Sequence, residues 1–205
     1  MGAVYFSSDP SGDEDARLVR QSLAGDTDAF GQLVTRYQKP MYTVALRMLG
    51  NAEDARDVTQ DAFVKAFSQL RTFDPAYRFF SWLYRIVINE CLNLIRSRRR
   101  IEPLDGALSG GGNPFDATLA HQRRNQIEAA MLQLPPDYRA VVALRHFAEQ
   151  TYADIAEALD IPETTVKSRL YSARQLLGEM LLGWKEPIKH EGASVQLAPR
   201  RDEMQ

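Results

Sequence analysis

A stretch rich in glycine and proline near the middle of the chain limits what this sequence can fold into. Residues 101–116 contain four glycines and two prolines, a composition typical of flexible linkers. The stretch divides the chain into two parts of roughly 60–75 residues, a size at which a hydrophobic core is thin. We therefore expect two small domains, over residues 26–100 and 118–183, joined by a linker at 101–117.

Both parts have the spacing of amphipathic helices. In the first part, apolar residues recur at every third or fourth position from Phe30 to Leu49. Pro40 lies inside this run and should kink or divide the helix. Two further helices are expected over about 52–70 and 80–98, with a loop between them. No segment alternates in the manner of a β-strand, so the predicted fold is all-α with two helical domains.

The two ends of the chain lack such a period. Residues 1–25 are expected to form a mobile acidic arm, and residues 184–205 a disordered tail. No apolar run approaches the ~20 residues of a membrane helix, and the start of the chain does not resemble a secretory signal. The single cysteine, Cys91, excludes an intrachain disulfide and a cysteine-based zinc site. These features predict a protein of the reducing cytoplasm.

The most specific local pattern lies in the second part, over residues 151–174. A short amphipathic helix meets a break at Asp160-Ile161-Pro162, and a second helix begins near Glu163. Asp160 occupies the turn position where glycine is commonest, which is tolerable because Asp can adopt the left-handed conformation. The pattern is that of a helix-turn-helix, in which the second helix enters the major groove of DNA.

The second helix of this motif has two distinct faces. At 100° per residue, Val166, Leu170, Ala173 and Leu177 form one apolar stripe. Polar side chains face away from it and cations flank them, as contacts with bases and phosphates require. The candidate DNA-binding residues are Thr164, Thr165, Lys167, Ser168, Arg169, Tyr171, Ser172 and Arg174. The alternative is a plain helical hairpin with a solvated face.

The predicted helix over 80–98 has a polar line opposite its apolar side. This line consists of Trp82, Arg85, Asn89, Asn93, Arg96 and Arg100, which align within about 40° of one line along the helix. Arginine suits phosphates, and asparagine amides suit base edges. Phe73 and Tyr77, on the preceding loop, are candidates for stacking on the bases of an unpaired strand. For Phe80 and Trp82, packing in the core is the alternative interpretation.

Other chemistry is less well supported. The predicted helix over 52–70 has an acidic face, which from charge alone is best interpreted as a solvated surface. His121, His146 and His190 are far apart and lack the spacing of metal ligands. Cys91 lies among apolar residues, which favours a buried thiol over a redox sensor. We expect no enzymatic activity, no metal and no cofactor.

Two stretches, in order along the chain, resemble the two DNA-binding regions of bacterial RNA polymerase sigma factors. Residues 51–67, followed by Phe73 and residues 81–89, resemble region 2. Residues 134–145 and the helix-turn-helix resemble region 4. Because the two regions are joined by a short linker with no third domain between them, the chain is similar to the extracytoplasmic-function (ECF) subfamily. The resemblance covers about residues 26–183.

The resemblance implies a function and a set of partners. A sigma factor binds core RNA polymerase, directs it to specific promoters and helps to melt the minus-ten region so that transcription begins. The resemblance also implies an anti-sigma factor as a further partner. The alternative is a stand-alone helix-turn-helix regulator that binds its operator without polymerase.

The resemblance also implies roles for individual residues. The clamp helices of the polymerase would dock on Asp54, Asp57, Val58, Gln60, Asp61 and Phe63. The minus-ten element would be bound by the candidate set Phe73, Tyr77, Arg85, Asn89, Asn93 and Arg96, with Phe73 and Asn89 lining the pocket for a flipped base. In the second part, the residues that match the recognition helix for the minus-thirty-five element are Lys167, Ser168, Arg169, Tyr171 and Ser172. Ser172 departs from the family pattern, since many members have arginine there.

Overall fold

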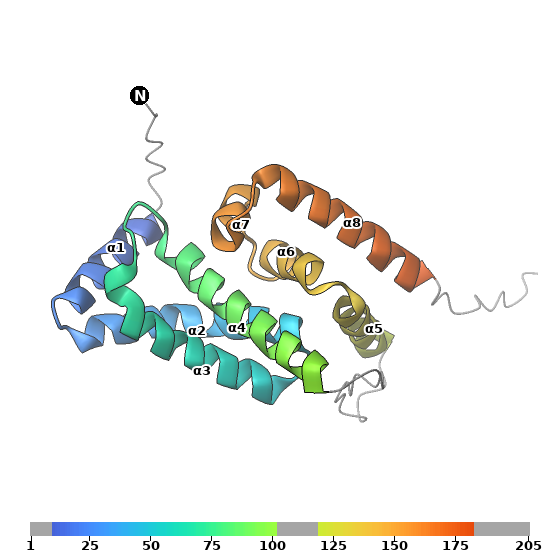
Figure 1. Ribbon diagram of the computed structural model, residues 1–205, viewed down its shortest axis with the longest axis horizontal. Helices are drawn as coiled ribbons and strands as arrows, with labels where there is room; N and C mark the ends of the chain where they lie inside the picture. Colours follow the sequence, from blue (N-terminus) through green and yellow to red (C-terminus); the bar gives the residue numbers. More distant parts are fainter. Residues whose placement is uncertain (1–9, 102–118, 183–205) are drawn as a thin grey trace, which may run out of the picture.

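The computed structural model describes residues 10–101 and 119–182 and shows an all-α protein (Figure 1). Within these residues there is no β-strand. The helices are α1 (Pro10–Leu23), α2 (Thr27–Leu49), α3 (Ala52–Gln69), α4 (Phe79–Ile101), α5 (Leu119–Gln133), α6 (Pro136–His146), α7 (Tyr152–Leu159) and α8 (Glu163–Leu182). A short 3₁₀ turn, η1 (Leu70–Thr72), follows α3. Helices α1–α4 form one bundle and α5–α8 form a second, which confirms the predicted all-α fold with two helical units.

Caps in the sequence set the two ends of α2. The Asp26 carboxylate accepts hydrogen bonds from the backbone N–H groups of Asp28 and Ala29, which are otherwise unpaired in the first turn. Gly50 ends the helix with a φ of 70°, a left-handed conformation that costs glycine little. These two caps bring α3 back antiparallel to α2.

α2 runs without interruption from Thr27 to Leu49 although it contains Pro40. Of the kink or division predicted at Pro40, the division is therefore wrong. Pro40 removes one backbone hydrogen bond and crowds the preceding turn, at a cost of ~3 kcal/mol. Met41, Val44 and Met48, on the following turns, are completely buried. Their burial, at ~1.5–3 kcal/mol for each side chain, outweighs that cost.

α1 corrects the prediction of a mobile acidic arm over residues 1–25. The helix is attached to the first bundle by two buried apolar side chains and by Asp15, which is also buried. The Asp15 carboxylate accepts hydrogen bonds from the guanidinium of Arg36, at 2.5 Å, and from the hydroxyl of Tyr37 on α2. The largely polar composition of α1 concealed the helix, because so few of its side chains carry the attachment.

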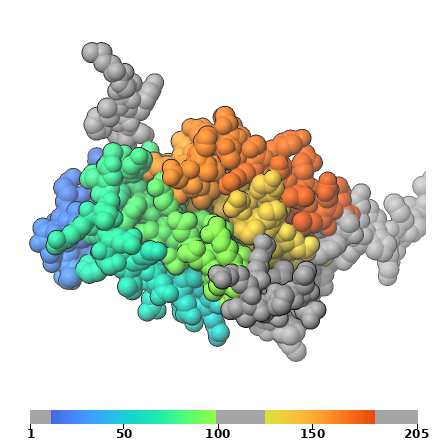
Figure 2. Space-filling model, viewed as in Figure 1, coloured from blue at the N-terminus to red at the C-terminus, as the bar shows by residue number. Residues whose placement is uncertain are grey.

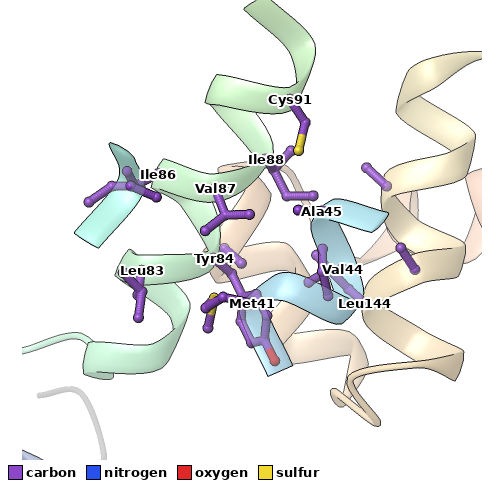
Figure 3. Packing of buried hydrophobic residues seen from close by; sticks show 14 of the residues in the cluster. Met41, Val44, Ala45, Leu83, Tyr84, Ile86, Val87, Ile88, Cys91 and Leu144 are labelled. Atoms are coloured by element: carbon purple, nitrogen blue, oxygen red, sulfur yellow. The ribbon is translucent and has the colours of Figure 1, made fainter. Parts of the chain in front are cut away.

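The two bundles pack against each other along one continuous hydrophobic core. α4 lies beside α7, and α2 lies beside α5 and α6 (Figure 1). Figure 3 shows buried side chains of α2 and α4 in one cluster with Leu144 of α6. The guanidinium of Arg139 on α6 is buried at the junction and donates a hydrogen bond to the carbonyl oxygen of Met48, at 2.6 Å, near the end of α2. Figure 2 shows the side chains of the two bundles in contact on the face drawn.

Some predicted segments fall outside the described residues. These are residues 1–9 of the arm, the linker at 101–117 apart from Ile101, which ends α4, and the tail at 184–205. None of the helices in the described part of the chain combines the length and apolar character needed to cross a membrane.

Candidate nucleic-acid interface

The turn between α7 and α8 has the geometry of a helix-turn-helix. The Thr151 hydroxyl accepts a hydrogen bond from the backbone N–H of Asp154, and the Asp154 carboxylate accepts one from the N–H of Thr151, each at 3.2 Å. This reciprocal cap begins α7. Asp160 ends it with a φ of 55°, so the predicted left-handed conformation is confirmed. The N–H of Ile161 then donates to the carbonyl of Ala156, at 3.1 Å, which closes the turn.

α8 is anchored by its apolar stripe and leaves its polar side in solvent. Val166, Leu170 and Ala173 are buried, as the helical period predicted. Thr164, Lys167, Ser168 and Arg174 are exposed, and the Tyr171 side chain is 66% exposed. Thr165 and Ser172 are half-buried at the edges of this side. We call the eight candidate residues from Thr164 to Arg174 the α8 surface.

Arg169 differs from the other cations of the α8 surface. Its guanidinium lies 3.4 Å from the carboxylate of Asp137 on α6, and its side chain is mostly covered. Lys167 is exposed, with its ammonium 6.0 Å from the centre of the Tyr152 ring on α7. Lys167 and Arg174 are therefore exposed cations that could contact DNA phosphates on this surface. Arg169 would have to break its ion pair with Asp137 before it could make such a contact.

The aromatic residues of the loop before α4 divide into buried and exposed members. The Phe73 ring is 8% exposed and packs on the rings of Phe79 and Trp82, with centroids 5.7 and 5.3 Å away. Tyr77 is 54% exposed. The structure thus places Phe73 in the wall of the first bundle and Tyr77 on its surface. Of the two rings proposed for base stacking, only that of Tyr77 is accessible in this arrangement.

Four members of the predicted polar line on α4 can be followed on its surface. Trp82 instead packs on the rings of Phe73 and Phe79, and the side chain of Arg100 lies outside the described residues. Asn89, Asn93 and Arg96 are exposed. Arg85 is half-buried, and its guanidinium donates hydrogen bonds to carbonyl oxygens of Glu157, at 2.5 Å, and Ala158, at 3.4 Å. We call Tyr77, Arg85, Asn89, Asn93 and Arg96 the α4 surface. The sequence predicted which residues share this side of the helix, but not that the second bundle covers part of it.

The candidate residues on α3 are not all on its surface. Asp57, Gln60 and Asp61 are exposed, whereas Val58 and Phe63 are buried in the first bundle. Asp54 is mostly covered and pairs with the guanidinium of Arg98 on α4, at 2.6 Å. The exposed three form an acidic patch on the outer side of α3.

Two exposed apolar residues extend this patch and were missed. Val64 and Phe67 are large apolar side chains of α3 with at least half of their surface in solvent. A signal was available, because Val64 and Phe67 follow Asp57, Gln60 and Asp61 at the three- and four-residue spacing of one helical side.

Redox or metal chemistry has little support in this part of the chain. Cys91 is fully buried, and burial raises the pKa of its thiol to about 12, with the carboxylate of Glu90 adding to the shift. A thiol with so high a pKa does not form the reactive thiolate. Among the residues that the structure describes, no three His, Cys, Asp or Glu side chains are grouped as metal ligands would be.

Comparisons with known proteins match two segments of the chain to two regions of one family. The family description "Sigma-70 region 2" matches residues 33–101, and "Sigma-70, region 4" matches residues 124–177. The ECF RNA polymerase sigma factor SigW of Bacillus subtilis is 34% identical over 178 residues, which cover 80% of this chain and 95% of SigW. The RNA polymerase sigma-H factor of Pseudomonas aeruginosa is 34% identical over 182 residues, covering 82% and 94% of the two chains.

Solved structures give the same result at the level of the fold. The structure of CnrH in complex with the cytosolic domain of CnrY aligns with a TM-score of 0.67 and 27% identity. The alignment covers 84% of this chain and 99% of CnrH. The likeness therefore extends over both bundles rather than over the helix-turn-helix alone.

Proposed function

This chain belongs to the ECF sigma factors of bacterial RNA polymerase, and from that premise we propose which of its surfaces bind the polymerase and which bind the promoter. A sigma factor binds core RNA polymerase, directs it to specific promoters and helps to melt the minus-ten region. Sigma factors are transcription initiation factors rather than enzymes. The observation that carries the function is the presence of regions 2 and 4, in that order, on one chain. A stand-alone helix-turn-helix regulator would not need region 2.

The α8 surface reads the minus-thirty-five element. An α-helix fits the major groove, and its outward polar side chains then reach the base edges. Thr164, Ser168 and Tyr171 are exposed in the middle of this surface. Lys167 and Arg174 are exposed beside them and would neutralise phosphates, which positions the helix without specifying sequence.

The α4 surface binds the unpaired strand of the minus-ten element. Asn89 and Asn93 offer amide donors and acceptors to a base that has left the stack, and Arg85 and Arg96 suit the phosphates on either side. Flipping a base costs a few kcal/mol. Stacking on an aromatic ring, worth ~1–3 kcal/mol per base, offsets that cost. The exposed ring of Tyr77 supplies the stacking surface, and Phe73 supports the pocket from within the bundle.

The outer side of α3 docks on core polymerase. Asp57, Gln60 and Asp61 provide an exposed acidic patch, and Val64 adds apolar area next to it. Exposed apolar side chains beside charged ones are typical of protein interfaces, where the apolar part contributes affinity and the charges contribute orientation. Val58 and Phe63 hold this helix in place from the buried side.

Because core polymerase and promoter DNA are in the bacterial cytoplasm, we propose that this protein acts there. We also propose an anti-sigma factor as a further partner. The support is membership of the ECF group. The related CnrH, which covers both bundles of this chain in the structural alignment, was solved in complex with the cytosolic domain of another protein, CnrY. A comparable protein partner would hold this chain away from the polymerase.

Reconstituted run-off transcription tests the proposal. Core polymerase is mixed with the purified chain and genomic DNA, and specific transcripts are expected only when both proteins are present. The double variant Asp57→Lys, Asp61→Lys should lose binding to core polymerase while remaining folded, because both residues are exposed. Glu179→Lys, exposed on α8 away from α3, makes the same change in net charge as either single variant, Asp57→Lys or Asp61→Lys, and is their matched control. If the chain binds an operator but yields no transcript with core polymerase, it is a stand-alone regulator.

A further inference from the structure

A cavity of about 630 Å³ lies between the middle of α2, the start of α4 and the loop that joins α6 to α7. This volume is typical of small-molecule sites, which run from about 300 to 1,000 Å³. The residues that line it include no member of the α4 surface, the α8 surface or the acidic patch on α3. The cavity is therefore separate from the surfaces proposed above for DNA and polymerase.

Tyr84 brings an unused hydrogen-bond donor to the wall of this cavity. The residue is 3% exposed, and its hydroxyl has no hydrogen-bond partner among the residues that the structure describes. Burial raises the pKa of Tyr84 to about 12, so the hydroxyl stays protonated and able to donate near neutral pH. A buried tyrosine hydroxyl ordinarily has a partner, because an unpaired buried donor destabilises the fold. Tyr84 therefore offers its O–H to an acceptor on a molecule inside the cavity.

Three cations line the same cavity and add donors to it. Arg36 and Lys39 come from α2, and Arg78 comes from the segment just before α4. Lys39 is exposed and has no ion pair in the described part of the chain. Carboxylates of Asp15 and Asp154 hold the two guanidinium groups in position, yet both arginine side chains remain partly in solvent. A guanidinium has five N–H donors, so pairing with one carboxylate leaves donors for a second anion.

The balance of charge favours a ligand with a single acidic group. Two carboxylates, those of Glu149 and Asp154, line the cavity against the three cations, which leaves an excess of one positive charge. Asp154 is already occupied, because it accepts hydrogen bonds from the Thr151 hydroxyl, at 2.6 Å, and from Arg78, at 3.1 Å. Glu149 is exposed and would repel a ligand that carries a chain of several acidic groups.

Aromatic rings from both bundles supply contacts for a planar group. Phe80 on α4 and Phe147, which follows α6, both line the cavity and are half-buried. The Arg78 guanidinium lies 5.7 Å from the centre of the Phe80 ring, so a cation and an aromatic surface are adjacent. Such rings bind flat, polarisable molecules, and nucleobases stack well on them. Donors, one excess positive charge and aromatic rings together match a base that carries one phosphate.

We propose that this cavity binds a nucleoside monophosphate. The phosphate contacts Arg36, Lys39 and Arg78, the base lies against the aromatic lining, and the Tyr84 hydroxyl donates to the ligand. The site lies outside the surfaces that bind promoter and polymerase in the proposed function, so it is an additional binding activity of the chain.

Calorimetric titration of the full-length protein with AMP, GMP, CMP and UMP tests the site. At least one nucleotide should bind with a stoichiometry of one. It should bind about tenfold more tightly than its nucleoside, which lacks the phosphate. It should also bind at least about fivefold more tightly than ribose 5-phosphate, which lacks the base. Absence of binding by all four nucleotides overturns the proposal, and so does equal affinity for either fragment.

Two substitutions locate the bound nucleotide. Tyr84→Phe removes only the hydroxyl, so it should leave the stability unchanged and weaken nucleotide binding about three- to tenfold. Its control is Tyr42→Phe, which removes a hydroxyl on α2 outside the cavity. Lys39→Gln should weaken binding about tenfold. Its control is Arg56→Gln, which loses the same charge at an exposed position of α3. If neither substitution weakens binding more than its control does, the cavity is not the site.

Competition with single-stranded DNA separates this site from the α4 surface, which also recognises bases in the proposed function. An excess of a short random-sequence strand should leave nucleotide affinity changed by less than about twofold, because the strand and the nucleotide occupy different surfaces. Displacement of the nucleotide by the strand would place it on the α4 surface and overturn the proposal. Run-off transcription tests the proposed function separately, and its failure would leave the nucleotide titration unaffected.

Discussion

The α4 surface and the α8 surface carry similar chemistry, but the molecule treats their cations differently. On α8, Lys167 and Arg174 extend into solvent. On α4, Arg85 is half-buried and donates to two backbone carbonyls of the other bundle. A guanidinium that is partly removed from water needs acceptors, and in the absence of DNA the chain supplies them. Each surface also has a cation of the other kind, because Arg96 on α4 is exposed and Arg169 on α8 is paired with Asp137. The comparison shows that exposure, and not residue type alone, decides which cations are available in the free protein.

The largest expected effect is on stability, and it distinguishes the buried side of α8 from its exposed side. Leu170 is buried and its neighbour Tyr171 is 66% exposed. Leu170→Ala should lower the free energy of unfolding by about 2–5 kcal/mol, because it leaves a cavity in the core. Tyr171→Ala should change it by under about 0.5 kcal/mol while weakening binding to a minus-thirty-five duplex. Urea unfolding and duplex titration measure the two quantities. Similar losses of stability would mean that the two faces of α8 have been assigned wrongly.

The next effect tests the α4 surface through Asn89. Its side chain is exposed, and asparagine is a mediocre helix former, so Asn89→Ala should not destabilise the fold. Loss of a hydrogen bond to a flipped base should cost ~1–3 kcal/mol of discrimination between minus-ten sequences. Preference at the minus-thirty-five element should be unchanged, because α8 reads that element separately. The measurement is transcription from a panel of single-base minus-ten variants, and an unaltered profile would remove Asn89 from the pocket.

Much of this comparison could be predicted from local sequence, because both surfaces follow from helical periodicity. Val166, Leu170 and Ala173 fall on one stripe, and the opposite residues of α8 are indeed exposed. The left-handed Asp160 followed from turn chemistry. Asn89 and Asn93 were likewise placed on the outer side of α4. These features depend on residues within a few positions of each other.

Contacts between residues far apart in the chain could not be predicted from helical periodicity. Arg85 meets Glu157 across 72 positions, and Arg139 reaches the carbonyl of Met48 across 91 positions. α1 was missed for the same reason, because its attachment depends on Asp15 binding Arg36 and Tyr37 of α2. Phe73 was expected to be available on the loop, but its ring completes a cluster with Phe79 and Trp82.

The third prediction concerns the cations of the α8 surface. Lys167 and Arg174 are exposed, and Arg169 is paired with Asp137. The full chain on a minus-thirty-five duplex should therefore show a log–log salt slope of about −2, at roughly −0.9 for each phosphate contact. A slope near −3 would indicate that Arg169 leaves Asp137 on binding.

Two substitutions show which cation contributes to the salt dependence of duplex binding. Lys167→Ala should reduce the steepness of the slope by about 0.9. Arg169→Ala should leave it unchanged if the pair with Asp137 persists in the complex. A slope near zero in the wild-type chain would show that α8 does not lie against the phosphate backbone at all.

The smallest effect tests the side of α4 opposite its DNA-binding surface. Cys91 is fully buried there, and its pKa is raised from 9.0 to about 12, mainly by burial. Below pH 9 the thiol is protonated in both the folded and the unfolded chain, so it has little effect on stability. Above pH 9 the unfolded chain loses the proton while the folded chain keeps it, so stability falls as pH rises toward 12. The loss attributable to Cys91 should be about 0.8 kcal/mol at pH 9.5 and under about 0.1 kcal/mol at pH 8.

The measurement is the difference in unfolding free energy between wild type and Cys91→Ala across this pH range. Tyr84, whose pKa is also raised to about 12 by burial, titrates in both proteins, and its contribution cancels. Cys91→Ala will itself be less stable because of the cavity, but that loss does not depend on pH. The gap between the two proteins should therefore narrow as pH increases from 8 to 9.5. If the difference in unfolding free energy stayed constant, the thiol would ionise as readily in the folded chain as in the unfolded chain. The side of α4 that carries Cys91 would then be accessible to water.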